Sequence, residues 1–339
     1  MSDALNKPKP RKKKTLLIAV CVIVGLLAAT AITFTATPVP AALLIRKLFE
    51  TPNISPPEGY TDMQSAVKIY ADIVYPSENG SNTLDFYLPD SEAAVLRPVI
   101  LWVHGGAYVG GDKSDAQHYC TALASEGYVV ISMNYARAPE ARFPVPINQI
   151  KEVYDWLVAV QGQYSLDLTH IFFAGDSAGA HSVATFTLIQ TNPDYARELG
   201  IAASVPKEHI KGVLLYCGPF DVQAIGEVKG IFGFFIKRAG WAYFGTKNWA
   251  EEFAEIASIS PHLTVDYPPV FVTDGNANSF EPQGMYFVAA LEAIGVPVTS
   301  YFIPLETKAS HEYQFLMDSP TGIECYKLTV QFLQEFKAL

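Results

Sequence analysis

The residues best suited to chemistry in this sequence lie in the stretch Gly175-Asp176-Ser177-Ala178-Gly179. It stands between the apolar run HIFFAG and the small-residue run AGAHSVATFTLIQT, which predicts a strand that turns directly into a helix. A serine at such a turn has strained backbone geometry that lifts its hydroxyl clear of the sheet, and small flanking residues let strand and helix approach. This G-x-S-x-G pattern indicates that Ser177 is a nucleophile.

A second motif, His104-Gly105-Gly106-Ala107, follows the earlier apolar run PVILWV. Bare glycine backbone can come close to a substrate and donate N–H groups, and the N-terminus of the helix after Ser177 supplies another donor. We therefore expect Gly105, Gly106 and Ala178 to form an oxyanion hole. His104 would then orient this loop and not act as the base.

The general base should follow the last predicted strand, where His311 stands in the segment SHEYQF. The acid that orients the base has two candidates. Asp274 ends the strand run PPVFVTD and Glu281 begins the next predicted helix, and either carboxylate could accept the His311 N–H. Asp274 is preferred, because a strand end is a stiffer platform than a helix start.

Strand-like and helical runs alternate from residue 66 onward. VKIYADIVY and NTLDFYLP predict an opening antiparallel pair, and INQIKEVYDWLVAVQ has the apolar spacing of a helix. This alternation predicts an α/β fold with a mostly parallel central sheet and helices on both faces. Ligands of such sheets bind beyond the carboxyl ends of the strands, where Ser177, Asp274 and His311 are expected.

The N-terminus differs from the rest of the chain. Residues 1–14 carry six Lys or Arg and one acid, Asp3, whereas residues 15–37 carry no charge and are long enough to cross a roughly 30 Å hydrocarbon layer. We expect 1–14 to be a basic cytoplasmic tail and 15–37 a transmembrane anchor of a single-pass protein, with the catalytic domain on the outer side. The alternative is a cleaved signal peptide and a secreted enzyme.

The remaining boundaries follow from composition. Residues 38–65 predict a linker that contains a short helix, AALLIRKLF, on the membrane or against the catalytic body. Residues 66–339 form the predicted catalytic domain, and the aromatic-rich segment 222–258 is interpreted as a cap insertion. Its aromatic residues either line a substrate pocket or simply cover the sheet.

Charge and cysteine content exclude some functions. The net charge of −10 argues against nucleic acid, which needs a positive surface that replaces counterions. Cys21 lies in the apolar span, and Cys120, Cys217 and Cys325 are far apart and form no metal-type pair, so they are expected to be small buried side chains.

The motifs in residues 66–339 resemble the hormone-sensitive-lipase-like branch of the α/β-hydrolases, the bacterial carboxylesterase group. The resemblance rests on the HGGA loop, GDSAG, NYARAPEARFPVP and the final HEYQF, in that order. It implies an α/β-hydrolase fold with a helical cap over the site, contributed by residues 38–60 and 222–258. It also implies hydrolysis of a small-molecule ester through an acyl-serine, with no cofactor and no metal.

Two positions depart from the family pattern. Many members place the catalytic aspartate where this chain has Asn278, which cannot stabilise an imidazolium in the same way, so the acid must be Asp274 or Glu281. Gln149 also replaces an acid common in the family. The predicted function is a serine carboxylesterase acting on short-chain acyl esters. The alternatives are a lipase or amidase on the same scaffold, or a binding protein without catalysis, which Asn278 keeps open.

Overall fold

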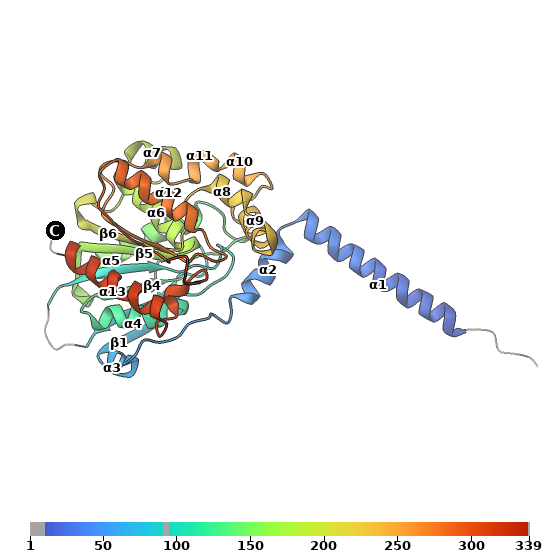
Figure 1. The fold of residues 1–339 in the computed structure, drawn as a ribbon, viewed down its shortest axis with the longest axis horizontal. Coiled ribbons are helices and arrows are strands. Elements are labelled where there is room, and N and C mark those ends of the chain that lie inside the picture. Colours follow the sequence, from blue (N-terminus) through green and yellow to red (C-terminus); the bar gives the residue numbers. More distant parts are fainter. Residues whose placement is uncertain (1–10, 91–94, 338–339) are drawn as a thin grey trace, which may run out of the picture.

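A central eight-stranded sheet organises the chain in the order β1-β2-β4-β3-β5-β6-β7-β8. Figure 1 shows the fold in a computed structural model, which describes residues 11–90 and 95–337. β1 pairs with β2 and β2 with β4 in antiparallel fashion, and the strands from β4 to β8 pair in parallel. The strands are β1 Val67–Val74, β2 Thr83–Pro89, β3 Arg97–Val103, β4 Val129–Met133, β5 Leu166–Asp176, β6 Ile210–Tyr216, β7 Val270–Asp274 and β8 Val298–Phe302. The predicted α/β class and its opening antiparallel pair are confirmed.

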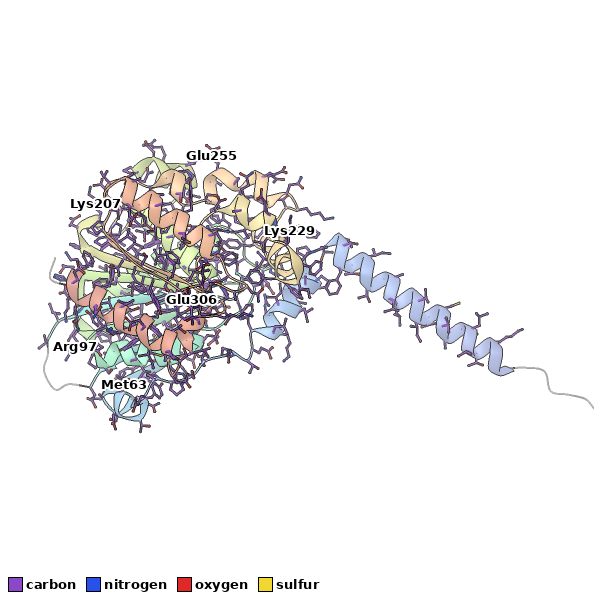
Figure 2. All side chains as sticks on the ribbon, viewed as in Figure 1. Met63, Arg97, Lys207, Lys229, Glu255 and Glu306 are labelled. Carbon is purple, nitrogen blue, oxygen red and sulfur yellow. The ribbon has the colours of Figure 1, made fainter. Side chains whose placement is uncertain are left out.

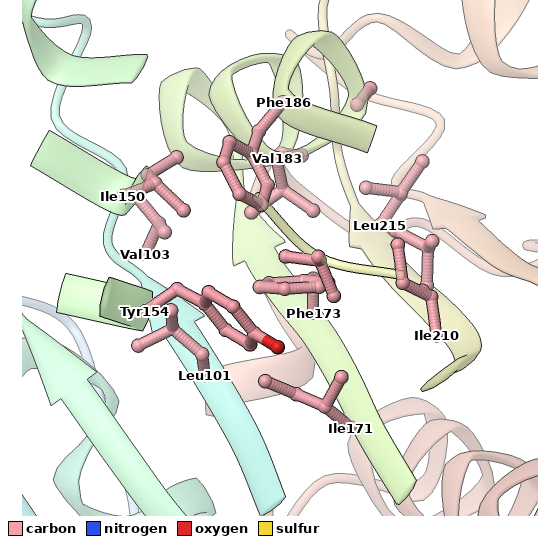
Figure 3. Close-up of a cluster of buried hydrophobic side chains, with 14 of the residues drawn as sticks. Leu101, Val103, Ile150, Tyr154, Ile171, Phe173, Val183, Phe186, Ile210 and Leu215 are labelled. Carbon is pink, nitrogen blue, oxygen red and sulfur yellow. The ribbon is translucent and has the colours of Figure 1, made fainter. Parts of the chain in front are cut away.

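Helices cover both faces of this sheet because its strands point apolar side chains both ways. In β3, Leu101 and Val103 pack toward the first face, and Ile100 and Trp102 pack toward the second. The first face is covered by α5 Val145–Tyr164, α6 Ala178–Thr191 and α12 Glu281–Ala293. The second is covered by α4 Gln117–Ser125 and α13 Pro320–Phe336. Figure 3 shows part of the first core, where Phe173 of β5 meets Val183 and Phe186 of α6.

Short helices lie over the carboxyl ends of the strands and form a third apolar cluster around Tyr108, Ala178 and Tyr243. They are α2 Val39–Leu48, α8 Val222–Glu227, α9 Gly230–Phe244, α10 Trp249–Glu252 and α11 Ala254–Ala257. Two further helices, α3 Tyr60–Ser65 and α7 Pro193–Leu199, lie at the periphery. Helices from residues 38–60 and 222–258 thus lie together over this end of the sheet.

The helix expected within 38–65 is α2, and it lies against the body. Its Ala42 and Ile45 are buried in the cap cluster, beside α9. Arg46 holds it in place: Nε donates to the Val109 carbonyl at 2.7 Å, and the guanidinium pairs with Glu140 at 2.7 Å.

The N-terminal apolar segment forms α1 Arg11–Ala36, which projects away from the body (Figure 1). Within the described part of the chain, Lys14–Ala36 is long and apolar enough to cross a membrane, although a signal sequence would pass the same test. Most of the predicted basic tail, residues 1–10, lies outside the described residues. All four cysteines are free thiols, and the three in the body are buried, as expected.

Candidate active site

Ser177 sits at an abrupt junction between β5 and α6. Its φ of 48° and ψ of −116° are strained for a residue with a side chain. A Cβ at Gly179 would come within 2.0 Å of the Val103 carbonyl oxygen, and one at Gly175 within 2.6 Å of Gly179. The flanking glycines are therefore required by the close approach of helix and strand, as the motif predicted.

His311 and Ser177 face each other across the carboxyl end of the sheet. His311 Nε2 lies 2.9 Å from Ser177 Oγ, and the imidazole lies beside the rings of Phe232 and Phe280. Burial lowers the pKa of His311 to about 4, so the imidazole is neutral near pH 7 and can accept a proton.

The loop that carries His311 is attached to the loop that follows β7. The His311 N–H donates to the Ala277 carbonyl at 3.2 Å. The side chain of Asn276 crosses between the loops, because Nδ2 donates to the Thr307 carbonyl at 2.7 Å and Oδ1 accepts the Ala309 N–H at 3.1 Å. These contacts fix the position of His311 relative to Asp274.

A serine that the sequence analysis did not identify stands between His311 and Asp274. Ser279 Oγ lies 2.7 Å from His311 Nδ1 and also hydrogen-bonds the Asp274 carboxylate. A hydroxyl has one proton, and a carboxylate only accepts, so the Ser279 O–H donates to Asp274 and accepts the His311 Nδ1–H. This chain sets the tautomer of His311 and leaves Nε2 free to accept from Ser177.

Of the two predicted acids, Asp274 is the one that joins this series of hydrogen bonds. Its carboxyl is buried, and burial raises its pKa to about 7 despite the hydrogen bond from Ser279. Its Oδ2 has no hydrogen-bond partner within the described residues. Glu281 begins α12 and, across the same described residues, makes no hydrogen bond or ion pair with His311, whereas Asn278 has an exposed side chain and a φ of 52°.

The glycine loop departs from the expectation at one residue. The Gly105 N–H donates to Asp176 Oδ2 at 2.7 Å, so it is already used and does not point at a substrate. The N–H groups of Gly106, Ala107 and Ala178 take part in no hydrogen bond in the described part of the chain. The expected set of Gly105, Gly106 and Ala178 is therefore corrected to Gly106, Ala107 and Ala178 as available donors.

The buried Asp176 forms a carboxyl pair with Glu312, the half-buried residue after His311. Asp176 accepts the Trp102 indole N–H at 2.8 Å, and burial raises its pKa to about 6. Burial and the charge of Asp176 raise the pKa of Glu312 well above its usual range. The pair thus holds a proton near neutral pH, and Glu312 Oε1 lies 3.9 Å from His311 Nε2.

The reacting groups lie between two cavities of different polarity. A narrow cavity of about 30 Å³ next to Ser177 is lined by apolar residues of the cap and glycine loop, among them Tyr108, Ile236 and Phe244. A second cavity, of about 220 Å³, is lined by His311 and Gly106 and by the carboxyl groups of Asp115, Asp176 and Glu312. The aromatic residues of the cap do not all line these cavities. Phe244 lines the narrow cavity, whereas Phe234 and Trp241 line a third, separate pocket.

The other residues singled out in the sequence have structural contacts. His104 is buried, stacks on Tyr135 and hydrogen-bonds the Gly105 carbonyl at 2.7 Å through Nδ1. Gln149 is buried and accepts the Ala136 N–H at 2.7 Å. Ligand-type atoms of Cys217, Asp274 and His311 lie within 4.8 Å of one another, but both His311 nitrogens already contact serine hydroxyls.

Comparisons with known proteins agree with this fold. The sequence matches the BD-FAE family over residues 84–283. Two similar curated proteins are Esterase LipC and Esterase LipQ of Mycobacterium tuberculosis, which are 29% and 25% identical over 66% and 68% of this chain. The chain spans about half the length of these relatives, 55% and 54% respectively.

The fold is also similar to a solved structure, Esterase B of Lactobacillus rhamnosis. The TM-score is 0.72 at 22% identity, with 93% of this chain and 96% of that chain covered. The chain belongs to the BD-FAE family, within the hormone-sensitive-lipase-like branch of the α/β-hydrolases.

The Asp176–Glu312 pair predicts a pH-dependent stability effect for Glu312→Gln. A carboxyl whose pKa is raised by folding stabilises fully below its unfolded pKa, and this contribution is lost as pH rises toward the folded value. Glutamine does not titrate, so the melting temperature of Glu312→Gln relative to the unaltered protein should rise between pH 5 and pH 9. Each kcal/mol of change in the free energy of unfolding corresponds to a shift of roughly 2–4 °C in melting temperature.

The melting temperatures of both proteins are measured in detergent at each pH. Glu292→Gln, at an exposed position of α12, is the control, and its effect should not grow with pH. If the melting temperature of Glu312→Gln relative to the unaltered protein stays constant or falls as pH rises, the two carboxyl groups do not share a proton.

Proposed function

We propose that this protein is a serine carboxylesterase that hydrolyses esters with short acyl groups. The observation that carries the proposal is the 2.9 Å contact between His311 Nε2 and the Ser177 hydroxyl at the strained β5–α6 junction. The names of the mycobacterial relatives, both esterases, support the same reaction class.

In acylation, Ser177 Oγ attacks the ester carbonyl while its proton moves to His311 Nε2. The carbonyl oxygen gains negative charge, and the N–H groups of Gly106, Ala107 and Ala178 are available to donate hydrogen bonds to it. Removing a donor of this kind typically costs about 10²–10³ in kcat. His311 then gives its proton to the leaving alcohol, and water repeats the steps to release the acid.

Asp274 serves as the acid, and Ser279 transmits its effect to His311. When His311 becomes an imidazolium, its Nδ1–H strengthens the hydrogen bond to Ser279, whose hydroxyl in turn donates to Asp274. In its ionised form, which predominates above its pKa of about 7, Asp274 therefore stabilises the imidazolium across one intervening hydroxyl. This role for Ser279 explains how the site operates although Asn278 replaces the family's aspartate.

The two cavities support a small acyl group and a polar alcohol. The apolar cavity of about 30 Å³ beside Ser177 has room for only a few heavy atoms. The larger cavity next to His311 is lined by Asn53, Ser310 and carboxyl groups, which suit an alcohol that carries further hydroxyl groups.

The apolar helix α1 supports membrane attachment. Within its candidate span, Lys14–Ala36, the apolar 18-residue window has no buried residue in the described structure. We propose that α1 anchors the protein as a single-pass helix with the catalytic domain on the outer side, since the basic residues precede it.

The central test is the hydrolysis of nitrophenyl esters from acetate to palmitate. The full chain in detergent should hydrolyse acetate and butyrate, with rates falling for longer acyl groups, and Ser177→Ala should lose several orders of magnitude in kcat/KM. A fluorophosphonate probe should label the unaltered protein and not Ser177→Ala. Serine-independent hydrolysis, or no labelling, would contradict the mechanism.

The acid assignment is tested with three variants. Asp274→Asn should lower kcat by about 10³–10⁴ with little change in KM, because the imidazolium loses its counter-charge. Ser279→Ala should cause an intermediate loss, and Glu281→Gln should be nearly neutral. Full activity of Ser279→Ala would show that Asp274 acts without the intervening hydroxyl, and equal losses at Asp274 and Glu281 would overturn the choice of acid.

The acyl limit is tested at Ile236, a half-buried residue of α9 that lines the narrow cavity. Ile236→Ala should widen the cavity and raise the ratio of kcat/KM for hexanoate over acetate by roughly tenfold. Ile231→Ala, on the same helix but 80% exposed, is the matched control and should leave the ratio unchanged. An unchanged ratio for Ile236→Ala would mean that the acyl group binds elsewhere.

A further inference from the structure

Two cap helices present exposed apolar residues at the end of the body where α1 leaves it. On α9, Ile231, Phe234, Arg238 and Trp241 recur at the spacing of one helical face, and Ile231 and Phe234 are 80% and 46% exposed. On α2, the exposed residues include Leu43, Leu44 and Leu48, while Ala42 and Ile45 of the opposite side are buried against the cap. We call the exposed residues of this set, with the half-buried Arg238 and Trp241 beside them, the cap face.

The cap face is directly connected to the candidate membrane span. Only Thr37 and Pro38 separate α1 from α2. The Arg238 guanidinium on α9 donates to the Phe34 carbonyl near the end of α1 at 2.5 Å. Figures 1 and 2 show α2, α9 and the labelled Lys229 at the end of the body nearest α1. If α1 crosses a bilayer, the cap face lies at its surface.

A basic pocket opens on this face. It has a volume of about 370 Å³ and is lined by Lys237, Arg238, Lys247 and Trp241, with no acidic residue among its lining side chains. Arg238 and Lys247 lie 5.4 Å and 4.8 Å from the Trp241 ring. This grouping of cations departs from the net charge of −10 of the chain as a whole.

We propose that the cap face is a docking surface for a lipid bilayer with anionic headgroups. Exposed aliphatic residues suit the acyl boundary, a tryptophan suits the headgroup level, and the three cations suit lipid phosphates. A second protein copy could bury the apolar residues, but a pocket with three cations would repel its own copy. The inference rests on the proposal that α1 spans a membrane.

The docked helix also forms a wall of the catalytic cavity. Ile236, Ala239 and Gly240 of α9 line the narrow cavity beside Ser177, and Trp249 lines both that cavity and the basic pocket. Lipid bound to one side of α9 therefore lies a single helix away from the proposed acyl site.

The test uses the full chain in nanodiscs of phosphatidylcholine, with or without phosphatidylglycerol, and lipids brominated near the headgroup as quenchers of tryptophan. Of the four tryptophans, Trp102 and Trp249 are buried, and Trp156 packs on α5 against the first face of the sheet. Quenching should therefore depend mainly on Trp241 and should be largely lost in Trp241→Phe. Ile231→Asp with Phe234→Asp should also abolish it. Discs that contain phosphatidylglycerol should quench more strongly than discs of phosphatidylcholine alone. The double variant Lys237→Gln, Lys247→Gln should lose this difference.

Val265→Asp is the matched control, because Val265 is 77% exposed and adjoins Asp266, which pairs with Lys207 at the end of the body away from α1 (Figure 2). It should leave quenching unchanged. Equal quenching of the unaltered protein and Trp241→Phe would overturn the proposal, as would burial of Trp241 by protein self-association in place of lipid.

Two further readouts separate this proposal from those on which it rests. Extraction of the protein from liposomes by alkaline carbonate would show that α1 does not span the bilayer, which would remove the basis of the docking surface. Hydrolysis of nitrophenyl acetate in the same discs should persist in the cap-face variants, so a failure of lipid contact remains distinct from a failure of the esterase mechanism.

Discussion

The close packing of α6 against β3 and β5 at Ser177 is the constraint on which the rest of the site depends. The missing side chains at Gly175 and Gly179 let the helix start directly at the strand end, within reach of the Val103 carbonyl. This contact forces Ser177 into its strained conformation and directs the first N–H groups of α6 toward the same space as the serine hydroxyl. The large apolar core between the sheet and α5 and α6 offsets the strain.

Around that junction, the site is held by hydrogen bonds between segments that are distant in the sequence. Asp176 ties the glycine loop to the nucleophile strand by accepting from Gly105 and Trp102. Asn276 ties the His311 loop to the end of β7. Each loop therefore has a buried polar anchor. The carboxyl pair of Asp176 and Glu312 avoids two adjacent negative charges by retaining a proton.

The cap joins two environments. One side of α9 faces the proposed acyl cavity, and its exposed side carries apolar and basic residues beside the end of α1. Because α2 follows α1 after two residues and packs against α9, the cap and the N-terminal helix are mechanically linked. An esterase built this way would meet its substrates close to a bilayer surface. Its narrow cavity would favour short acyl groups over the long chains of a lipase substrate.

The sequence by itself determined the fold class, the strand and helix order, Ser177 as the residue at the strand–helix junction and His311 as its partner. The fold class and Ser177 follow from local patterns, since apolar periodicity and a five-residue turn motif require only neighbouring residues. His311 follows from its place after the last predicted strand. Only the tertiary structure decided which carboxylate reaches His311, that Ser279 lies between them, that Asp176 occupies the Gly105 N–H, and that Glu312 adjoins Asp176. Each of these depends on how side chains from loops far apart in the chain meet, and on a turn at Asn278 with a φ of 52° that brings Ser279 back toward Asp274. Residue types and spacing along the chain do not encode such meetings, because they arise from the packing of separate elements.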